Sequence, residues 1–181
     1  MTTVAIQGIR GSYSEEAALR MLGASADLIE CCDFASTFEA VTAKRATHAV
    51  IPLRNKIVGE IGAVADLLAQ TELTVLEELD LDIRHVLAGT ATAEIGDVIT
   101  VRSHIEALKQ CSSFLAANPH IRQITGDDTA SSISQIAGED KKQNAAIGSA
   151  RAAKIYGATI LRKDIANDLN NWTTFGLIGQ Q

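Results

Sequence analysis

The sequence predicts an α/β fold built as two lobes. Short apolar runs typical of buried strands alternate with helical segments along all 181 residues. This alternation falls into two successive series, which suggests two lobes with a ligand cleft at the carboxyl ends of strands. Hydrophobic residues make up 46% of the chain and charged residues 21%, as in an ordinary globular protein.

The first lobe is expected to begin with a strand, a glycine turn and a capped helix. Ser12–Glu15 and Ser36–Glu39 both have the Ser-x-x-Glu form of a capping box, so each is expected to open a helix. The free backbone N–H groups at the first of these helix starts would form a natural anion site. The expected strands lie at 4–6, 28–32, 48–53 and 73–79, and a continuation of the last strand to 88 is left open. The expected helices lie at 15–22, 36–41 and 63–68.

The second lobe is expected to repeat this construction. Ser103–Glu106 forms a third capping box, whose helix should run through Cys111 until Pro119 stops it, and Asp128 should cap the next helix. The expected strands lie at 98–101, 121–124, 145–148 and 158–161, with a small helix at 149–156 and a last strand at 175–178. Such alternation predicts mostly parallel strands with right-handed crossovers.

The chain is expected to enter the second lobe near residue 80 and to leave it near residue 165. The last strand would then rejoin the first lobe. This gives a first lobe of residues 1–80 plus 165–181 and a second lobe of residues 81–164.

Composition excludes several classes of protein. The net charge is −6 without a Lys/Arg cluster, which argues against a nucleic-acid partner. No apolar run approaches the roughly 20 residues that span a bilayer, and the N-terminus lacks the pattern of a signal peptide. We therefore expect a cytoplasmic protein. The 3 cysteines and 4 histidines show no zinc spacing, so neither a metal nor a cofactor is expected.

Chemistry concentrates near the end of the chain, around the only tryptophan. Asn170 and Asn171 precede Trp172, and two threonines follow it at the start of an apolar run. Neutral hydrogen-bonding groups at the mouth of a buried strand suit a pocket for a polar ligand. A last strand that uses threonine for its β-propensity would look the same.

Six segments resemble the motifs of one enzyme family and follow the same order along the chain. Asn171, Thr173 and Phe175 match Asn-x-Thr-Arg-Phe, except that Thr174 replaces the arginine. Residues 8–18 resemble Gly-x-x-Gly-Thr/Ser-aromatic-Ser-x-x-Ala-Ala, 52–59 resemble Pro-x-Glu-Asn-Ser-x-x-Gly, and 103–111 resemble Ser-His-Pro-Gln-x-x-x-Gln-Cys; 128–130 and 145–148 fit later segments. These are motifs of the prephenate dehydratases, and the similarity covers residues 4 to 179.

This resemblance implies a two-lobed fold like that of the type II periplasmic binding proteins. It implies a carbon–oxygen lyase that converts prephenate, a dianion, to phenylpyruvate by loss of carbon dioxide and the ring hydroxyl, in phenylalanine biosynthesis. Family members are usually dimers or larger, so a homodimer or tetramer is expected. Many carry a C-terminal ACT domain that senses phenylalanine. Because the chain ends at Gln181, we expect that domain to be absent.

The resemblance also assigns residues. Thr173 takes the catalytic position, where its hydroxyl would hydrogen-bond the leaving oxygen. The expected substrate contacts are Asn55, Ser103, Gln110, Asn171, Phe175, Arg54, Lys56, Ser12 and Thr129. By pattern alone, Ser103 could instead be a helix cap, Gln110 an exposed helix residue and Asn55 a turn residue.

The departures from the motifs leave three interpretations open. Arg54 and Lys56 replace a glutamate and a serine while Thr174 removes an arginine, so one of the new cations could hold a substrate carboxylate; both could equally point to solvent. Dehydration is favoured by Asn55, Ser103, Gln110 and Thr173. The alternatives are a non-aromatising prephenate decarboxylase, at which Trp172 hints, and a non-catalytic ligand-binding relative.

Overall fold

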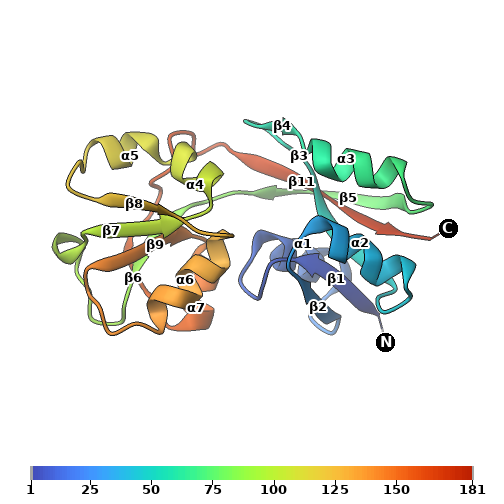
Figure 1. Ribbon diagram of the computed structural model, residues 1–181, viewed down its shortest axis with the longest axis horizontal. Helices are drawn as coiled ribbons and strands as arrows, with labels where there is room; N and C mark the ends of the chain where they lie inside the picture. Colours follow the sequence, from blue (N-terminus) through green and yellow to red (C-terminus); the bar gives the residue numbers. More distant parts are fainter. Residues whose placement is uncertain (1, 181) are drawn as a thin grey trace. The chain divides into compact units, whose positions relative to one another are not determined.

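The structure is a computed structural model that describes residues 2–180 (Figure 1). The chain divides into two compact units. Unit 1 comprises the residues up to Ile9, Tyr13–Asp82 and the residues from Asn171 onward, and unit 2 comprises Arg10–Ser12 and Ile83–Asn170. The sequence predicts that the two lobes meet near residues 80 and 165, and these lobe boundaries stay predictions.

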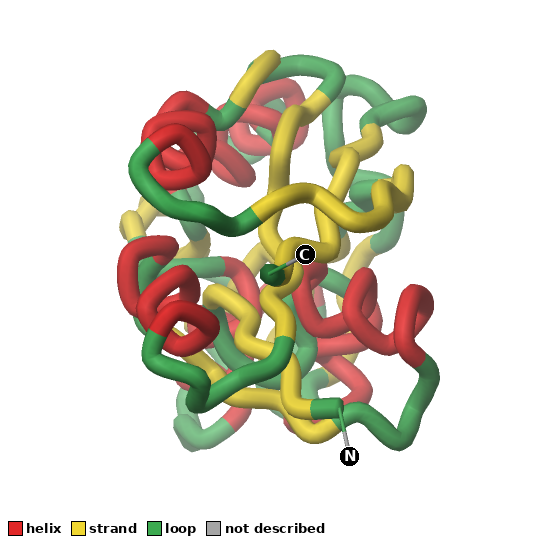
Figure 2. Tube along the Cα trace, turned by 90° about the vertical axis from the view of Figure 1, so that its right-hand side faces the viewer, coloured by secondary structure: helices red, strands yellow, loops and turns green. Residues whose placement is uncertain are grey.

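Unit 1 is built on one mixed sheet with the strand order β2-β1-β3-β11-β5. The strands are β1 (Thr3–Gln7), β2 (Asp27–Cys31), β3 (His48–Asn55), β5 (Thr74–Asp82) and β11 (Trp172–Gly179), and β4 (Gly59–Glu60) pairs with β3. Although β1 and β11 lie at opposite ends of the chain, both belong to this sheet (Figures 1 and 2).

The prediction of mostly parallel strands is wrong. In unit 1, β1 runs parallel to β2 and β3, but β11 runs antiparallel to β3 and β5. The reason lies in the path of the chain. It leaves unit 1 at the end of β5 and returns through β11, so that these two strands run in opposite directions. Alternation in the sequence cannot show this reversal, because it carries no information on strand direction.

The helices of unit 1 cover both faces of the sheet. They are α1 (Tyr13–Leu22), α2 (Phe34–Thr42) and α3 (Gly62–Ala69). From β1 the chain moves to β2 on one side, and from β2 it moves back across β1 to β3, so right-handed crossovers place α1 and α2 on opposite faces. The core on the α2/α3 face includes Phe38, Ile51, Val64 and Ile178.

The start of α2 corrects one predicted cap. Ser36 was expected as the N-cap, but the helix begins at Phe34 and Asp33 caps it. The backbone N–H of Ser36 donates to Asp33 Oδ1 at 2.7 Å, and Ser36 Oγ accepts from the backbone N–H of Asp33 at 3.3 Å. Ser36 is therefore the third helical residue of a reciprocal capping box. Aspartate serves as an N-cap at least as well as serine, so two overlapping signals competed in the sequence.

Unit 2 contains a second mixed sheet with the strand order β10-β6-β9-β7-β8. The strands are β6 (Val86–Gly89), β7 (Thr100–Ser103), β8 (Arg122–Thr125), β9 (Asn144–Gly148) and β10 (Thr159–Arg162). The helices are α4 (Ile105–Gln110), α5 (Ser112–Ala116), α6 (Thr129–Ala137) and α7 (Ala150–Tyr156), with a 3-10 turn at Ile95–Asp97. Strand β7 is parallel to β8 and β9, whereas β6 is antiparallel to β9 and β10.

Two expectations around residues 103–118 are wrong. Ser103 is the last residue of β7 rather than a helix cap; the cap is His104, whose side chain accepts from the backbone N–H of Glu106. The single long helix is two short ones that meet at Cys111. Cys111 is fully buried, and burial raises the pKa of its thiol to about 12. It is therefore a neutral core residue.

The predicted cap of α6 is confirmed. Asp128 caps this helix and accepts from the backbone N–H of Ser131 at 2.7 Å.

Within residues 2–180, no helix has both the length and the apolar character needed to cross a membrane.

Candidate active site

The Asn55 side chain organises a buried polar cluster at the ends of β3 and β11. Its amide nitrogen donates to Thr173 Oγ1 at 2.9 Å, to Asn171 Oδ1 at 3.0 Å and to the backbone oxygen of Trp172 at 3.0 Å. Its amide oxygen accepts from two backbone N–H groups of the following turn, at residues 57 and 58. Asn55, Asn171 and Thr173 are all at most 8% exposed. Asn55 is thus a strand residue whose amide is committed to partners within the chain.

This arrangement defines how the Thr173 hydroxyl can act. Among residues 2–180, the hydrogen-bond partner of Thr173 Oγ1 is the side-chain amide of Asn55. Because the oxygen accepts from an amide, its own proton points elsewhere and can be donated. The amide hydrogen bond also makes the hydroxyl a better donor, since chained hydrogen bonds polarise one another. Thr173 is therefore an oriented donor, which suits a developing negative charge on a leaving oxygen.

Thr173 and Asn55 share one face of the sheet, opposite the α2/α3 core. The register pairs Thr173 with Asn55 of β3 and with Leu81 of β5. Side chains alternate along β11, and Ile178 belongs to the α2/α3 core, so the odd-numbered positions face the other way. Phe175 follows Thr173 on that face and is 3% exposed. Its position fits packing beneath Thr173 better than the predicted contact with a ligand.

Arg54 and Thr174 are neighbours on the α2/α3 face. The two residues are register partners across β3 and β11, and Thr174 pairs on its other side with Asp80 of β5. The Thr174 hydroxyl donates to Asp80 Oδ1 at 2.5 Å. Arg54 Nη2 donates to Glu78 Oε2 at 2.8 Å, and half of the Arg54 side chain is exposed. This geometry favours a structural role for Arg54 over the predicted carboxylate clamp.

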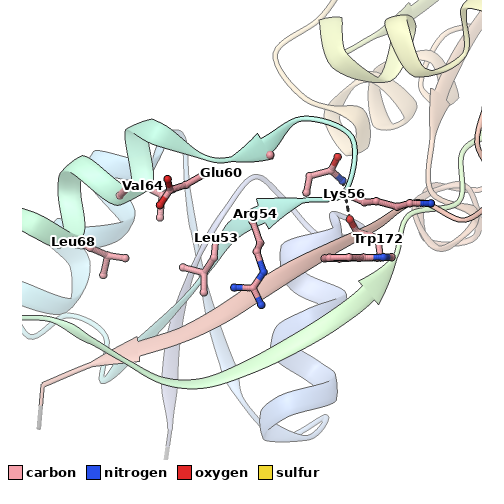
Figure 3. A pocket seen from close by; sticks show the side chains of 10 residues that line it. Leu53, Arg54, Lys56, Glu60, Val64, Leu68 and Trp172 are labelled. Carbon is pink, nitrogen blue, oxygen red and sulfur yellow. Dashed lines mark hydrogen bonds between the residues drawn. The ribbon is translucent and has the colours of Figure 1, made fainter.

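A pocket of about 470 Å³ lies in unit 1 between α3 and the β3–β4 hairpin. Figure 3 shows its apolar wall of Leu53, Val64 and Leu68, with Arg54 and Trp172 on the side of β3 and β11. Lys56 also lines the pocket, at its hairpin end. Thr173 does not line it, in keeping with its position on the opposite face of the sheet. Asn55, the hydrogen-bond partner of Thr173, does line the pocket, which therefore adjoins the polar cluster but does not include the Thr173 hydroxyl.

The other predicted contacts lie in unit 2. Ser103 is fully buried, and its hydroxyl donates to the backbone oxygen of Ile147 at 2.7 Å, which joins β7 to β9. Ser12 is 8% exposed and directly precedes α1. Thr129 is the half-buried first residue of α6. The structure thus brings Asn171 and Thr173 into contact with Asn55, and it places Ser12, Ser103, Gln110 and Thr129 in the other unit.

The glycine turn before α1 requires a residue without a side chain at position 11. Gly11 has a φ of +86°, and a Cβ atom there would lie 2.8 Å from the Cα atom of Ala152. The Gly11 oxygen accepts from the Ser149 hydroxyl at 2.8 Å, and that hydroxyl also caps α7. The turn is thus fixed against the start of α7 within unit 2.

His85 is a buried residue of this region that the sequence did not single out. It is 3% exposed and its Nε2 atom lies 3.0 Å from Gln110 Oε1. Because an amide oxygen can only accept, Nε2 carries the proton in this bond. Burial lowers the pKa of His85 below its ordinary value of 6.5, an effect that the Gln110 hydrogen bond partly opposes. A lone histidine between two strands gives no signal in a single sequence.

The lowered pKa of His85 predicts that the protein loses stability below pH 6.5. Above that pH the imidazole is neutral in both states. As the pH falls, the unfolded chain binds a proton that the folded chain resists, so the free energy of unfolding decreases. One unit below 6.5 the loss can reach at most about 1.4 kcal/mol, the value for a folded imidazole that binds no proton at that pH. Urea unfolding of the wild type and of His85→Gln at pH 7.5 and 5.5 measures it, because the variant lacks this proton uptake. Equal pH dependence in both proteins would contradict the prediction.

Comparisons with known proteins add to this geometry. A family model described as prephenate dehydratase matches residues 4–181. The chain belongs to the prephenate dehydratase family. It is 38% identical over 178 residues to arogenate dehydratase/prephenate dehydratase 2 of Arabidopsis thaliana, covering 98% of this chain and 46% of that protein. The resemblance inferred from the motifs is thereby confirmed.

Solved structures agree with this family and with the predicted fold class. Prephenate dehydratase of Arthrobacter aurescens, solved in complex with L-Phe, matches with a TM-score of 0.90 at 27% identity, over 99% of this chain and 61% of that one. A lipoprotein of Bacillus subtilis whose name assigns it to methionine binding matches with a TM-score of 0.51 at 8% identity, over 99% and 83% of the two chains. That second likeness concerns the fold alone. It confirms an α/β fold like that of periplasmic binding proteins, while the predicted cleft between lobes stays a prediction.

The present chain spans less than half of the plant relative and about three fifths of the bacterial enzyme. What those whole proteins bind and catalyse therefore reaches this chain only as a proposal.

The family motifs give a meaning to the pairing of Arg54 with Thr174. Where this chain has Arg54 and Thr174, the motifs have glutamate and arginine. Since the two positions are register partners, the motif residues would form a cross-strand ion pair on the α2/α3 face. In this chain the pair is replaced by two contacts to β5, Arg54 with Glu78 and Thr174 with Asp80. We therefore infer that the two departures are one coupled replacement, on the face of the sheet opposite Thr173.

A double-mutant cycle tests this coupling. We expect Arg54→Glu to destabilise the fold by about 1 kcal/mol, because it places a third acid beside Glu78 and Asp80. We expect Thr174→Arg to cost about 2 kcal/mol, because it inserts a cation beside Arg54 at a position 1% exposed. The double variant regains the ion pair, with a coupling energy of about 2 kcal/mol in urea unfolding. Additive losses would contradict the coupled replacement.

Proposed function

We propose that this chain catalyses the prephenate dehydratase reaction, in which prephenate loses carbon dioxide and its ring hydroxyl to give phenylpyruvate. The observation that carries the proposal is the hydrogen bond from the Asn55 amide to Thr173 Oγ1. It leaves the Thr173 proton available to the departing oxygen, at the position that the family motif gives to the catalytic threonine.

The chemistry asks little more of the protein than orientation and hydrogen bonds. Loss of carbon dioxide as hydroxide departs produces an aromatic ring, which supplies a large driving force. As the carbon–oxygen bond breaks, charge builds on the leaving oxygen, and a fixed donor is worth most there because it is already oriented. A threonine hydroxyl is a poor acid, so Thr173 stabilises the oxygen by hydrogen bonding rather than by full proton transfer.

The replaced motif arginine does not weigh against this proposal. Thr174 lies on the face of the sheet opposite Thr173, so its arginine counterpart would be remote from the leaving oxygen. Lys56, at the end of the hairpin held by Asn55, remains the cation that we assign to a substrate carboxylate. Gln110, Ser12 and Thr129 are proposed to complete the polar contacts. Cytoplasmic location and a homodimer or tetramer are also proposals, which rest on composition and on the family.

The test is to incubate the purified protein separately with prephenate and arogenate, follow ring absorbance and identify the products by mass spectrometry. Phenylpyruvate formed from prephenate faster than in a protein-free control supports the proposal. Faster turnover of arogenate would move the assignment to that substrate. A product that has lost carbon dioxide but kept its hydroxyl would identify a decarboxylase. Absence of turnover on both substrates would overturn the enzyme assignment in favour of a binding protein.

A further inference from the structure

The C-terminal end of α4 is held by the segment through which the chain returns from unit 2 to unit 1, and this segment is bonded to the outgoing one. In the returning segment, the backbone N–H of Asn167 donates to the backbone oxygen of Gln110 at 2.7 Å. The side-chain oxygen Oδ1 of Asn167 accepts from the backbone N–H of Ser113 at 2.9 Å. In the outgoing segment, the backbone oxygen of His85 accepts from the N–H of Ile165 at 3.4 Å. The Gln110 backbone is thus anchored. The direction of its side-chain amide depends on the side-chain contacts of Gln110.

The imidazole of His85 orients that side chain. Nε2–H donates to Gln110 Oε1 at 3.0 Å, and His85 is buried while Gln110 is half-buried. The oxygen and nitrogen of a carboxamide lie on opposite branches of a planar group. With Oε1 turned to His85, the NH₂ group is turned away from His85. When the imidazole carries its proton on Nε2, a rotation of the amide by 180° would place two donors against each other, so this tautomer selects one of the two orientations.

We propose that His85 is a positioning residue that fixes Gln110 as a hydrogen-bond donor toward an oxygen atom of the substrate. The inference rests on the proposed function, which places Gln110 in the substrate site. Prephenate offers only acceptor-rich groups to such a donor: two carboxylates, a ketone and a hydroxyl. A glutamine free to rotate would offer its oxygen half of the time, and that oxygen repels a carboxylate.

This role explains why a histidine occupies a buried place beside a polar partner. The neutral ring supplies a donor in a fixed plane, whereas a lysine or arginine would bring a charge into a buried site. Glutamine is the conservative replacement, because its Nε2–H₂ group can reach the place of the imidazole Nε2–H. Leucine fills a similar volume without any donor. The two substitutions therefore separate the hydrogen bond from the packing.

The experiment is a double-mutant cycle read by steady-state kinetics on prephenate. We expect His85→Leu to lower kcat/KM about tenfold, mainly through KM, because an oriented hydrogen bond to a charged group is lost. His85→Gln should stay within about threefold of the wild type. Gln110→Leu should remove the effect altogether, so that His85→Leu changes kcat/KM by less than about twofold in that background. Equal losses in the leucine and glutamine variants, or additive losses in the double variant, would overturn the inference.

A second readout does not depend on turnover. The side-chain NH₂ signals of Gln110 in a ¹⁵N-labelled protein are those that vanish in Gln110→Leu. We expect them to move in His85→Leu and to return close to their wild-type positions in His85→Gln. Signals that stay in place in both variants would overturn the inference even if the kinetics agree. If the wild type turns over neither substrate, the proposed function fails, while these signals still decide whether His85 orients Gln110.

Discussion

Replacing Thr173 by valine is expected to lower kcat on prephenate by about 10²- to 10³-fold while the protein stays folded. Valine keeps the shape of threonine and removes only the hydroxyl, so the leaving oxygen loses its oriented donor; losses of this size follow the removal of one such donor. The cost in stability should be about 1 kcal/mol, because Asn55 keeps its two other acceptors. Steady-state kinetics and urea unfolding of the same preparations measure both effects.

Two variants control this experiment. Thr173→Ser keeps a hydroxyl within reach of the Asn55 amide and should retain most of the activity. Thr37→Val removes the hydroxyl of a fully buried threonine in α2. This hydroxyl donates to the backbone oxygen of Asp33, the N-cap of the helix, at 2.7 Å. Thr37→Val should cost similar stability and leave kcat unchanged. A Thr173→Val protein with wild-type kcat would remove the catalytic role from this residue.

The sequence predicted best those features that are set locally. The strands at 4–6, 145–148 and 175–178 were found because their apolar runs are buried on both faces, and Asp128 was recognised because an N-cap acts within three residues. The break at Cys111 was missed because both short helices have apolar residues at helical spacing, and a kink leaves that spacing intact. Strand direction was missed because it depends on where the chain returns.

The same distinction applies to the site. The motifs identified Thr173, Asn55 and Asn171 individually, yet their mutual contact depends on the register between β3 and β11, which joins residues more than a hundred positions apart. That register also changes the meaning of Thr174. In the sequence it adjoins Thr173 and suggests a lost substrate contact, whereas alternation along the strand turns the two side chains to opposite faces. No pattern in one sequence links His85 to Gln110.

Replacing Asn55 by aspartate is expected to be the most destabilising single isosteric change in the cluster. The amide nitrogen donates to three oxygen atoms, and a carboxylate would instead oppose them with a buried negative charge. The oxygen that accepts from the turn at residues 57 and 58 is kept, so the change isolates the donor side. We expect a loss of about 3 kcal/mol in the free energy of unfolding and of about 100-fold in kcat/KM, since Thr173 loses its orienting partner.

The pH dependence separates this explanation from simple disruption of packing. A carboxyl group facing three acceptors has a raised pKa, and its protonated form regains one donor. The stability gap between Asn55→Asp and the wild type should therefore narrow as the pH falls from 7.5 to 5.5. Asn118→Asp is the matched control, because the half-buried Asn118 amide lies in unit 2 and, among residues 2–180, donates to a single acceptor, the backbone oxygen of Phe114 at 2.8 Å. It should lose little activity at any pH. If the gap for Asn55→Asp stayed constant with pH, the loss would come from packing, and Asn55 would not act on Thr173 through its amide donor.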